Sequence, residues 1–297
     1  MKITKTAVVS VVGRPNVGKS TLTNKLVGQK VAIVSSKPQT TRTRITGLLN
    51  KNGTQYVFLD TPGLHKPRTQ LGDYMCKVVT DTVSEVDAAM LVVEPIANIG
   101  PAEESLIAQL KQHRMPAILA INKIDTLKKE ELLAVIAVYA QAHDFEAVVP
   151  ISARTGEGLD ELLTEIGRYA IEGPQLFPED MVSDQPERQL AAEIVREKML
   201  RLLDREVPHG VAVGVERWNE REDGLIEINA VIYCEKASHK GIIIGKQGAM
   251  LKEIGRQARV DIERMLDAKV FLELWVKVKE GWRNNQYQMR NFGYEEL

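Results

Sequence analysis

The chain has 297 residues, of which 44% are hydrophobic, and its formal net charge is −1. This length is enough for two packed domains, and the near-zero charge excludes a globally basic nucleic-acid-binding protein, so an RNA site has to be local. The two cysteines, Cys76 and Cys234, lack the spacing of a zinc site or a disulfide scaffold, which indicates a reducing, cytoplasmic setting. We expect no signal peptide in residues 1–12 and no membrane-spanning run.

Residues 13–20 read Gly-Arg-Pro-Asn-Val-Gly-Lys-Ser, which fits the spacing of a phosphate-binding loop. A β-branched run at residues 6–12 precedes the loop and residues 21–27 can continue as a helix, a context that disfavours an accidental glycine turn. Backbone N–H groups of such a loop surround a polyphosphate, Lys19 reaches its β- and γ-phosphates, and the Ser20 hydroxyl ligates Mg²⁺. The predicted nucleotide-binding residues here are Gly13, Arg14, Pro15, Asn16, Val17, Gly18, Lys19, Ser20 and Thr21.

The following segments predict the contacts to the γ-phosphate and the metal. A polar stretch is followed by strand-like runs at residues 43–49 and 54–60, which an Asn-Gly turn joins as a hairpin. Asp60 ends the second run and can hold Mg²⁺ through water, and Gly63 can offer its N–H to the γ-phosphate. Either Thr40 or Thr41 could add a hydroxyl, and the spacing slightly favours Thr41. We predict Ser20, Thr41 and Asp60 as metal ligands and Asp60, Thr61, Pro62, Gly63 and Leu64 as nucleotide-binding residues.

Apolar runs at residues 88–93, 117–121 and 147–151 alternate with helix-length segments. This order predicts an α/β domain with a doubly wound, mostly parallel sheet that binds its ligand at the carboxyl ends of the strands. Asp125 follows one such end and can accept hydrogen bonds from N1–H and the 2-amino group of guanine, which adenine does not offer. We expect Lys123 over the base, Asn122 tied to the phosphate loop and the Ala153 N–H at the guanine carbonyl. The predicted base-binding residues are Asn122, Lys123, Ile124, Asp125, Ser152 and Ala153.

The motifs described above follow one another as they do in the small GTPase superfamily, which the chain resembles over about residues 5–170. The resemblance implies GTP binding, Mg²⁺ dependence and hydrolysis of GTP to GDP and phosphate, with Lys19, Thr41, Gly63 and Asn16 as catalytic residues. Many GTPases have a glutamine after Gly63 that orients the attacking water, but this chain has Leu64, which cannot do so. We therefore hypothesise that K⁺ stabilises charge with Asn16 as a ligand, as in related GTPases that carry this asparagine.

Residues 172–186 contain three prolines and separate two differently patterned halves. Beyond them the pattern predicts a helix with one apolar face, strands at residues 211–215 and 226–234, a helical stretch to about residue 267 and a last strand at residues 270–278. This order indicates a smaller α+β module. We predict a GTPase domain of residues 1–172, a linker of residues 173–187 and an RNA-binding domain of residues 188–297.

Residues 241–248, Gly-Ile-Ile-Ile-Gly-Lys-Gln-Gly, place a basic residue between glycines, and six basic residues face one acid between residues 236 and 259. The charges alone could be a solvated helix face. With the Gly-x-x-Gly turn between helices, however, the segment resembles a type II KH domain, which implies that single-stranded nucleic acid lies beside this turn. Residues 242–244 would then be partly exposed to bases. The predicted RNA-binding residues are Lys240, Ile242, Ile243, Ile244, Gly245, Lys246, Gln247, Gly248, Lys252 and Arg256.

A GTPase with this loop and one C-terminal KH module resembles the Era family over essentially the whole chain. The resemblance implies a monomeric, cytoplasmic GTP/GDP switch that binds the 3′ end of small-subunit ribosomal RNA and acts in assembly and maturation of the small ribosomal subunit. Gln247, where many relatives have glycine, departs from the pattern. Two other classes stay open: a signalling GTPase whose second domain docks a protein or a membrane surface, with peripheral contact to the inner face of the cell membrane, and a passive RNA-binding protein in which the nucleotide is structural.

Overall fold

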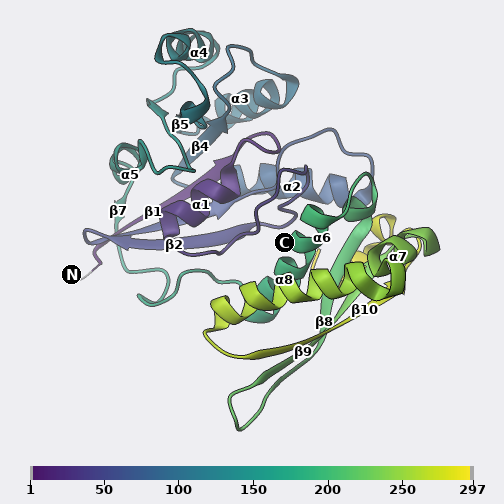
Figure 1. Cartoon of the computed structure of the whole chain (residues 1–297). Coiled ribbons are helices and arrows are strands. Elements are labelled where there is room, and N and C mark those ends of the chain that lie inside the picture. The colour runs from purple at the N-terminus through teal and green to yellow at the C-terminus, as the bar shows by residue number, and fades with distance from the viewer. Residues whose placement is uncertain (1–2, 295–297) are drawn as a thin grey trace. The chain divides into compact units, whose positions relative to one another are not determined.

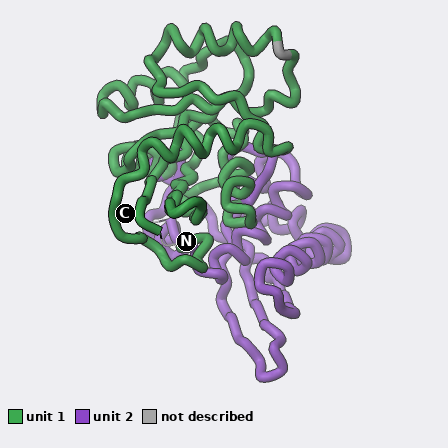
Figure 2. Tube along the Cα trace, turned by 90° about the vertical axis from the view of Figure 1, so that its left-hand side faces the viewer, with its two compact units in different colours: residues 1–32, 41–67, 75–184 green, residues 33–40, 68–74, 185–297 purple. Residues whose placement is uncertain are grey.

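The computed structural model describes residues 3–294, with the backbone alone for Lys129, and contains two compact units (Figure 2). The first unit consists of Met1–Ala32, Thr41–Pro67 and Met75–Asp184, and the second of Ile33–Thr40, Arg68–Tyr74 and Gln185–Leu297. Two short segments from the N-terminal half therefore belong to the unit formed by the C-terminal third. The last passage of the chain from the first unit to the second lies between Asp184 and Gln185, inside the predicted linker. The predicted domain boundaries at residues 172 and 188 stay a prediction.

The first unit contains a doubly wound, mostly parallel sheet, which confirms the predicted fold class (Figure 1). The strand order is β2-β3-β1-β4-β5-β6, in which only β2 runs antiparallel to its neighbour, and β7 pairs antiparallel with β1. The strands are β1 (Lys5–Val12), β2 (Ile45–Lys51), β3 (Thr54–Asp60), β4 (Ala88–Val93), β5 (Ala117–Ile121), β6 (Ala147–Pro150) and β7 (Ile171–Glu172).

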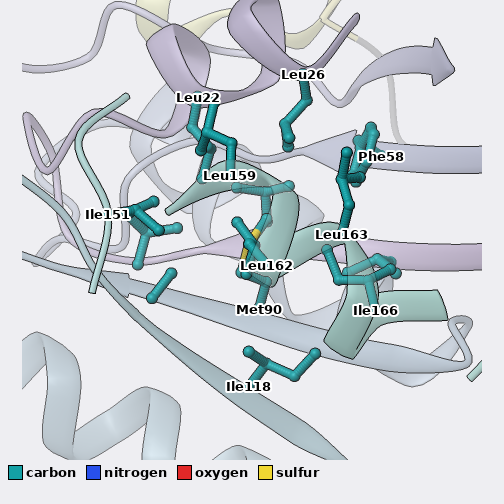
Figure 3. Packing of buried hydrophobic residues seen from close by; sticks show 14 of the residues in the cluster. Leu22, Leu26, Phe58, Met90, Ile118, Ile151, Leu159, Leu162, Leu163 and Ile166 are labelled. Carbon is teal, nitrogen blue, oxygen red and sulfur yellow. The ribbon is translucent and has the colours of Figure 1, made fainter. Parts of the chain in front are cut away.

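Helices cover both faces of this sheet, so its central strands are buried on both sides. Along β4, Met90 and Val92 pack with one hydrophobic cluster, while Leu91 and Val93 pack with another. Figure 3 shows the first cluster, where Leu22 and Leu162 come from two different helices. Helices α1 (Lys19–Val27) and α5 (Leu159–Gly167) supply the first cluster, and α2 (Gln70–Ser84), α3 (Pro101–His113) and α4 (Lys129–Ala142) supply the second.

Several predicted strands of the first unit have the bounds that their apolar runs indicate. The observed bounds of β3, β4 and β5 are the predicted ones, whereas β2 begins two residues later than expected, at Ile45. The predicted hairpin turn is confirmed, since Asn52 and Gly53 both have positive φ, of 52° and 78°. Two successive residues with positive φ fit a type I′ turn, whose twist matches that of the paired strands.

Residues 173–184 lie along β2 and β3 without forming a helix or a strand. The side chain of Gln55 is fully buried, and its Oε1 accepts from the backbone N–H groups of Leu176 and Phe177 at 2.9 and 3.0 Å. Farther along, the N–H of Leu48 donates to the carbonyl of Val182 at 2.9 Å. A buried amide needs such partners, so this part of the predicted linker is bonded to the first unit.

The C-terminal part of the second unit is an α+β module with a three-stranded sheet of order β10-β9-β8. β8 is antiparallel to β9, which is parallel to β10, and β8 continues five residues beyond the predicted end. In α8 the apolar side chains of Ile254, Ala258 and Ile262 share one face and are buried. The elements are α6 (Glu187–Leu202), β8 (Val211–Glu220), β9 (Ile226–Cys234), α7 (Ala237–Ile244), α8 (Ala249–Leu266), β10 (Val270–Val278) and α9 (Gln286–Asn291). Among the helices of residues 3–294, none is long and apolar enough to cross a membrane.

Candidate functional site

The phosphate loop connects β1 to α1 and has a preformed backbone. Gly18 has φ of 101°, and a Cβ there would lie 2.3 Å from Nδ2 of Asn122, so only glycine fits. The Lys19 side chain is buried, and its Nζ donates to the carbonyls of Gly13 and Arg14 at 3.0 Å each. Burial lowers the pKa of Lys19 to about 8, against the attraction of Asp60. The ammonium group therefore already lies inside the loop that is predicted to surround the phosphates.

The three predicted metal ligands lie together. Ser20 Oγ donates to Asp60 Oδ2 at 2.6 Å and lies 2.8 Å from Thr41 Oγ1. The other hydroxyl that the sequence left open, that of Thr40, donates instead to the carbonyl of Lys37 at 2.7 Å. Of the two threonines, Thr41 is therefore the one at the site.

The burial and hydrogen bonding of Asp60 show whether this group of oxygens fits a metal ion. Asp60 is fully buried, and burial raises its pKa to about 6, although Lys19 and the Ser20 hydrogen bond act in the opposite direction. Within the described chain, Asp60 Oδ1 has no hydrogen-bond partner. An unpaired buried carboxylate oxygen next to two hydroxyl groups suits a hard cation that keeps water ligands, so the donor set fits Mg²⁺.

The turn after β3 lies against the phosphate loop. A Cβ on Gly63 would lie 2.6 Å from the backbone of Pro15, so the two loops approach as closely as glycine allows. The N–H of Leu64 donates to the carbonyl of Gly13 at 3.2 Å, and the Leu64 side chain packs against the second core cluster of the sheet. Thr61 is buried and donates its hydroxyl to the Val11 carbonyl at 2.8 Å. A packed leucine offers no hydrogen bond to a water molecule, as the sequence indicated.

Asn122 ties the base-reading loops to the phosphate loop. Its Nδ2 donates to the Val17 carbonyl at 2.7 Å, and its Oδ1 accepts from the N–H of Ala153 at 2.9 Å. The Ala153 N–H therefore has a partner within the protein, and the expectation that it points to a guanine carbonyl differs from this structure. Lys123 Nζ donates to the Asn16 carbonyl at 2.7 Å and pairs with Glu94, so its aliphatic part crosses above the loop.

Asp125 is held on both of its carboxylate oxygens. Ser152 Oγ donates to Oδ1 at 2.6 Å, and Arg154 Nη2 lies 2.6 Å from Oδ2. The hydrogen bond from Ser152, followed by the charge of Arg154, lowers the pKa of Asp125 and keeps it ionised. Arg154 was missed by the sequence reasoning, and its only signal there was its position directly after Ser152 and Ala153.

The predicted RNA site is a turn between α7 and α8. Gly245 and Gly248 have φ of 73° and 78°, and Gln247 between them also has positive φ, of 51°. A Cβ on Gly248 would meet no atom within 4 Å, and Lys246 and Gln247 are exposed. The turn thus presents backbone and one lysine side chain on an open surface, which fits the approach of a nucleic-acid backbone.

The three isoleucines before this turn differ in exposure. Ile242 is 51% exposed and Ile244 is partly buried, but Ile243 is 0% exposed and belongs to the core of the module. The expectation that Ile243 contacts bases is therefore wrong, because each residue of a helix turns by about 100° from the one before it. On α8, Lys252 and Arg256 are exposed as predicted, and Lys240 of α7 is partly exposed.

Glu253, one turn earlier on α8, compensates the positive charge of Arg256. Arg256 Nη2 lies 2.7 Å from Glu253 Oε1, and hydrogen bonds from Arg256 and then Gln257 lower the pKa of Glu253 to about 2. The basic patch on α8 is therefore less positive than its sequence indicates.

Comparisons with known proteins identify the families that the two parts of the chain resemble. Residues 8–123 match the family model described as 50S ribosome-binding GTPase, and residues 206–283 match that of the KH domain. GTPase Era of Ruminiclostridium cellulolyticum is 55% identical over 291 residues, which are 98% of each chain. The chain belongs to the Era family of GTPases. GTPase Era of Clostridioides difficile is 50% identical over 98% of this chain and 99% of its own.

Two solved Era structures resemble the whole chain. One is Aquifex aeolicus Era, as a variant bound to GDP·AlF₄⁻, with a TM-score of 0.94, 41% identity and coverage of 98% and 100% of the two chains. The other is Era in complex with MgGDPNP and nucleotides 1506–1542 of 16S ribosomal RNA, with a TM-score of 0.95, 40% identity and coverage of 99% and 100%. The predicted family and the predicted fold are thus confirmed.

Proposed function

We propose that this Era-family GTPase is a guanine-nucleotide switch that binds the 3′ end of small-subunit ribosomal RNA and acts in assembly of the small ribosomal subunit. The observation that supports this most is the similarity over 99% of the chain to an Era structure that holds both MgGDPNP and a 16S ribosomal RNA segment. The work of such a switch takes place in the cytoplasm, where subunits are assembled.

GTP hydrolysis uses the residues around β1 and β3. Lys19 and the N–H groups of the phosphate loop hold the β- and γ-phosphates, and Gly63 offers its N–H to the γ-phosphate. Mg²⁺, held by Ser20, Thr41 and Asp60, supplies charge neutralisation at the phosphates. The gathering of these three side chains within hydrogen-bond distance supports this assignment.

Guanine is selected by Asp125. Its carboxylate stays ionised and accepts from N1–H and the 2-amino group, while Ser152 fixes its orientation. Adenine has an acceptor at N1 and no 2-amino group, so it would leave the carboxylate unpaired, a mismatch that can cost a factor of ~10⁴ or more.

Asn16 would hold K⁺ beside the phosphates, where the ion would supply positive charge. Asn16 is exposed at the tip of the phosphate loop with φ of 68°, so its side chain is available to an ion beside the nucleotide. Support for this step comes from the packed leucine, which leaves the transition state without a water-positioning amide.

RNA lies across the exposed side of α7, the glycine turn and α8. Lys246 meets a phosphate, Ile242 and Ile244 contact bases, and Lys252 and Arg256 extend the basic surface. Few aromatic residues lie in this region, so recognition depends on base-edge hydrogen bonds more than on stacking.

The test is crosslinking and sequencing of RNA bound to the protein in a bacterial lysate, with and without a non-hydrolysable GTP analogue. Wild type is compared with Lys246→Glu, and Lys279→Glu serves as the matched control outside the α7–α8 turn. A nucleotide-dependent footprint at the small-subunit ribosomal RNA 3′ end that Lys246→Glu alone removes supports the proposal. Diffuse crosslinks would contradict it and favour a signalling GTPase, for which flotation with anionic vesicles tests the peripheral membrane contact.

A further inference from the structure

Residues 33–40, which directly precede Thr41, belong to the second compact unit (Figure 2). In the sequence they lie between α1 and β2, inside the predicted GTPase domain. Within the second unit they contact α6, a helix that begins almost 150 residues later. The nature of these contacts shows how the metal site can depend on that unit.

The first contact is made by a buried carboxylate. Glu197 is 0% exposed, and its Oε1 accepts from the N–H of Val34 at 2.9 Å and from Arg201 Nη2 at 3.0 Å. Arg201 also donates from Nε and Nη2 to the carbonyl of Val34, at 3.3 and 3.0 Å. Both backbone groups of Val34 are thus held by charged side chains, a stronger kind of hydrogen bond than one between neutral groups.

The second set of contacts lies at the other end of the segment. The fully buried Arg196 donates from Nη2 to the carbonyl of Thr40, and Lys37 Nζ bonds to the Leu203 carbonyl and to Asp204. The carbonyl of Thr40 and the N–H of Thr41 are parts of one planar peptide group. By holding that carbonyl, Arg196 therefore restricts the orientation of Thr41, whose hydroxyl lies 2.8 Å from Ser20 Oγ.

The same buried cluster continues to the helix that carries the predicted RNA surface. Lys198 Nζ lies 2.8 Å from Glu197 Oε2 and also bonds to Asp261 of α8. Its side chain is 4% exposed, so this chain of charges is shielded from water and salt. Lys252 and Arg256 lie on the same α8.

Another short segment of the N-terminal half is bonded within the second unit in a similar way. Residues 68–74 follow Gly63 and also belong to the second unit. The N–H of Gln70 donates to Asn284 Oδ1 at 3.1 Å, and the Tyr74 ring lies 6.4 Å from that of Tyr294, which stacks on Trp282 at 5.8 Å.

We propose that Arg196, Glu197 and Arg201 of α6 are positioning residues for GTP hydrolysis, which fix Thr41 through residues 33–40 and make hydrolysis and RNA affinity depend on one another. The inference rests on the proposed function, because it concerns the regulation of the same nucleotide site. The contacts involve backbone groups of a segment that ends at a metal ligand, so any shift of that segment with nucleotide state changes their geometry. By linkage, RNA that favours one geometry of the second unit favours the matching nucleotide state by the same factor.

Arg201→Ala is the first variant, because the Arg201 side chain is 48% exposed and its loss leaves the core intact. Arg188→Ala is a matched control: Arg188 lies on the same helix and donates from Nε and Nη2 to a backbone carbonyl, but that carbonyl belongs to Val215 of β8. Arg201→Lys keeps the charge with a single ammonium donor. Lys37→Ala removes a different contact of the same segment, that with the Leu203 carbonyl and Asp204, and melting temperatures show that each variant folds.

We expect Arg201→Ala to lower kcat for GTP hydrolysis by about tenfold with little change in KM, because Thr41 is misplaced while nucleotide binding persists. Arg201→Lys should recover part of the loss, and Arg188→Ala should match wild type. A second readout is the affinity for an RNA of the small-subunit ribosomal RNA 3′ end, measured with a non-hydrolysable GTP analogue and with GDP. The ratio of the two RNA affinities should move toward one in Arg201→Ala and Lys37→Ala only.

Equal kcat values and equal affinity ratios in Arg201→Ala, Arg188→Ala and wild type would overturn the inference. An equal loss in Arg201→Ala and Arg188→Ala would also overturn it, since it would indicate general destabilisation of α6. Failure of the proposed function is separate, because it would appear as wild-type protein that does not bind this RNA. In that case the kcat comparison still decides whether α6 positions Thr41.

Discussion

Arg154 Nη2 lies 2.6 Å from Asp125 Oδ2, on the carboxylate that is proposed to read guanine. The ion pair occupies an oxygen that the base needs, so guanine binding has to displace the arginine. The Arg154 side chain is 76% exposed, so water competes with the ion pair and its displacement should cost little free energy.

Arg154→Ala should therefore tighten GDP binding by up to about fivefold at low salt, and the gain should shrink as salt screens the pair. Isothermal titration of nucleotide-free protein with GDP measures the effect. Arg168→Ala is the matched control, because Arg168 is 67% exposed and pairs with Glu165 away from the base site. Weaker GDP binding in Arg154→Ala would instead show that the arginine contacts the nucleotide.

Thr41 and Thr40 should differ in their effect on turnover. Thr41 Oγ1 lies 2.8 Å from Ser20 Oγ, whereas Thr40 donates to the Lys37 carbonyl. Removal of a metal ligand weakens charge stabilisation in the transition state, so Thr41→Ala should lower kcat by about tenfold or more and raise the Mg²⁺ concentration needed for half-maximal rate. Thr40→Ser, which keeps its hydroxyl, serves as the control and should stay within about twofold of wild type. A Thr41→Ala protein with wild-type Mg²⁺ dependence would remove Thr41 from the metal site.

The parts of the fold that could be predicted from the sequence are those where a pattern reports burial directly. β4 and β5 are continuous apolar runs, whereas β9 and β10 are rich in β-branched and other apolar residues that alternate in part with polar ones, and the bounds of all four match the expected ones. Among the last five residues of β8, Trp218 packs against the core of the module while the other four side chains are exposed, and this pattern gave no strand signal. Among three adjacent isoleucines, only the phase of the helix shows that Ile243 is the buried one.

The motifs predict the nucleotide-binding residues by their fixed spacing, and the structure brings Ser20, Thr41 and Asp60 together, but the surroundings of these residues could not be predicted. Arg154 carries no motif, and Glu197 is a buried acid within a helix whose charged residues look solvated in the sequence. Its partner Val34 lies 163 positions earlier in the chain, and no local pattern connects the two. Contacts of this kind depend on tertiary structure, which explains why the membership of residues 33–40 in the second unit was not foreseen.

Asn16 gives a prediction about monovalent cations. We expect GTP turnover of the wild type to be faster in K⁺ than in Na⁺ buffer, because a K⁺ ion held by Asn16 would stabilise the charge of the transition state, where Leu64 positions no water. Asn16→Gly should abolish this difference, since it removes the side-chain oxygen while glycine readily adopts the observed φ of 68°. Its GDP affinity, measured in Na⁺ as the control, should stay within about threefold of wild type. Equal wild-type turnover in both buffers would end the K⁺ hypothesis.

Glu253 should limit the RNA affinity of α8. The hydrogen bond from Arg256 is the main cause that lowers the pKa of Glu253 from 4.5 to about 2, so Glu253 stays ionised at working pH. The Glu253–Arg256 pair should therefore cause no change in RNA affinity between pH 5 and 8. Glu253→Gln leaves the charge of Arg256 uncompensated, and one further phosphate contact should steepen the slope of log affinity against log salt by about 0.7. Filter binding of the ribosomal RNA 3′-end oligonucleotide at several salt concentrations measures this slope. Glu227→Gln, which removes an acid of β9 that pairs with Arg221 just after β8, is the control and should leave the slope unchanged. If Glu253→Gln also leaves it unchanged, Arg256 does not face RNA, and the basic surface ends at Lys252.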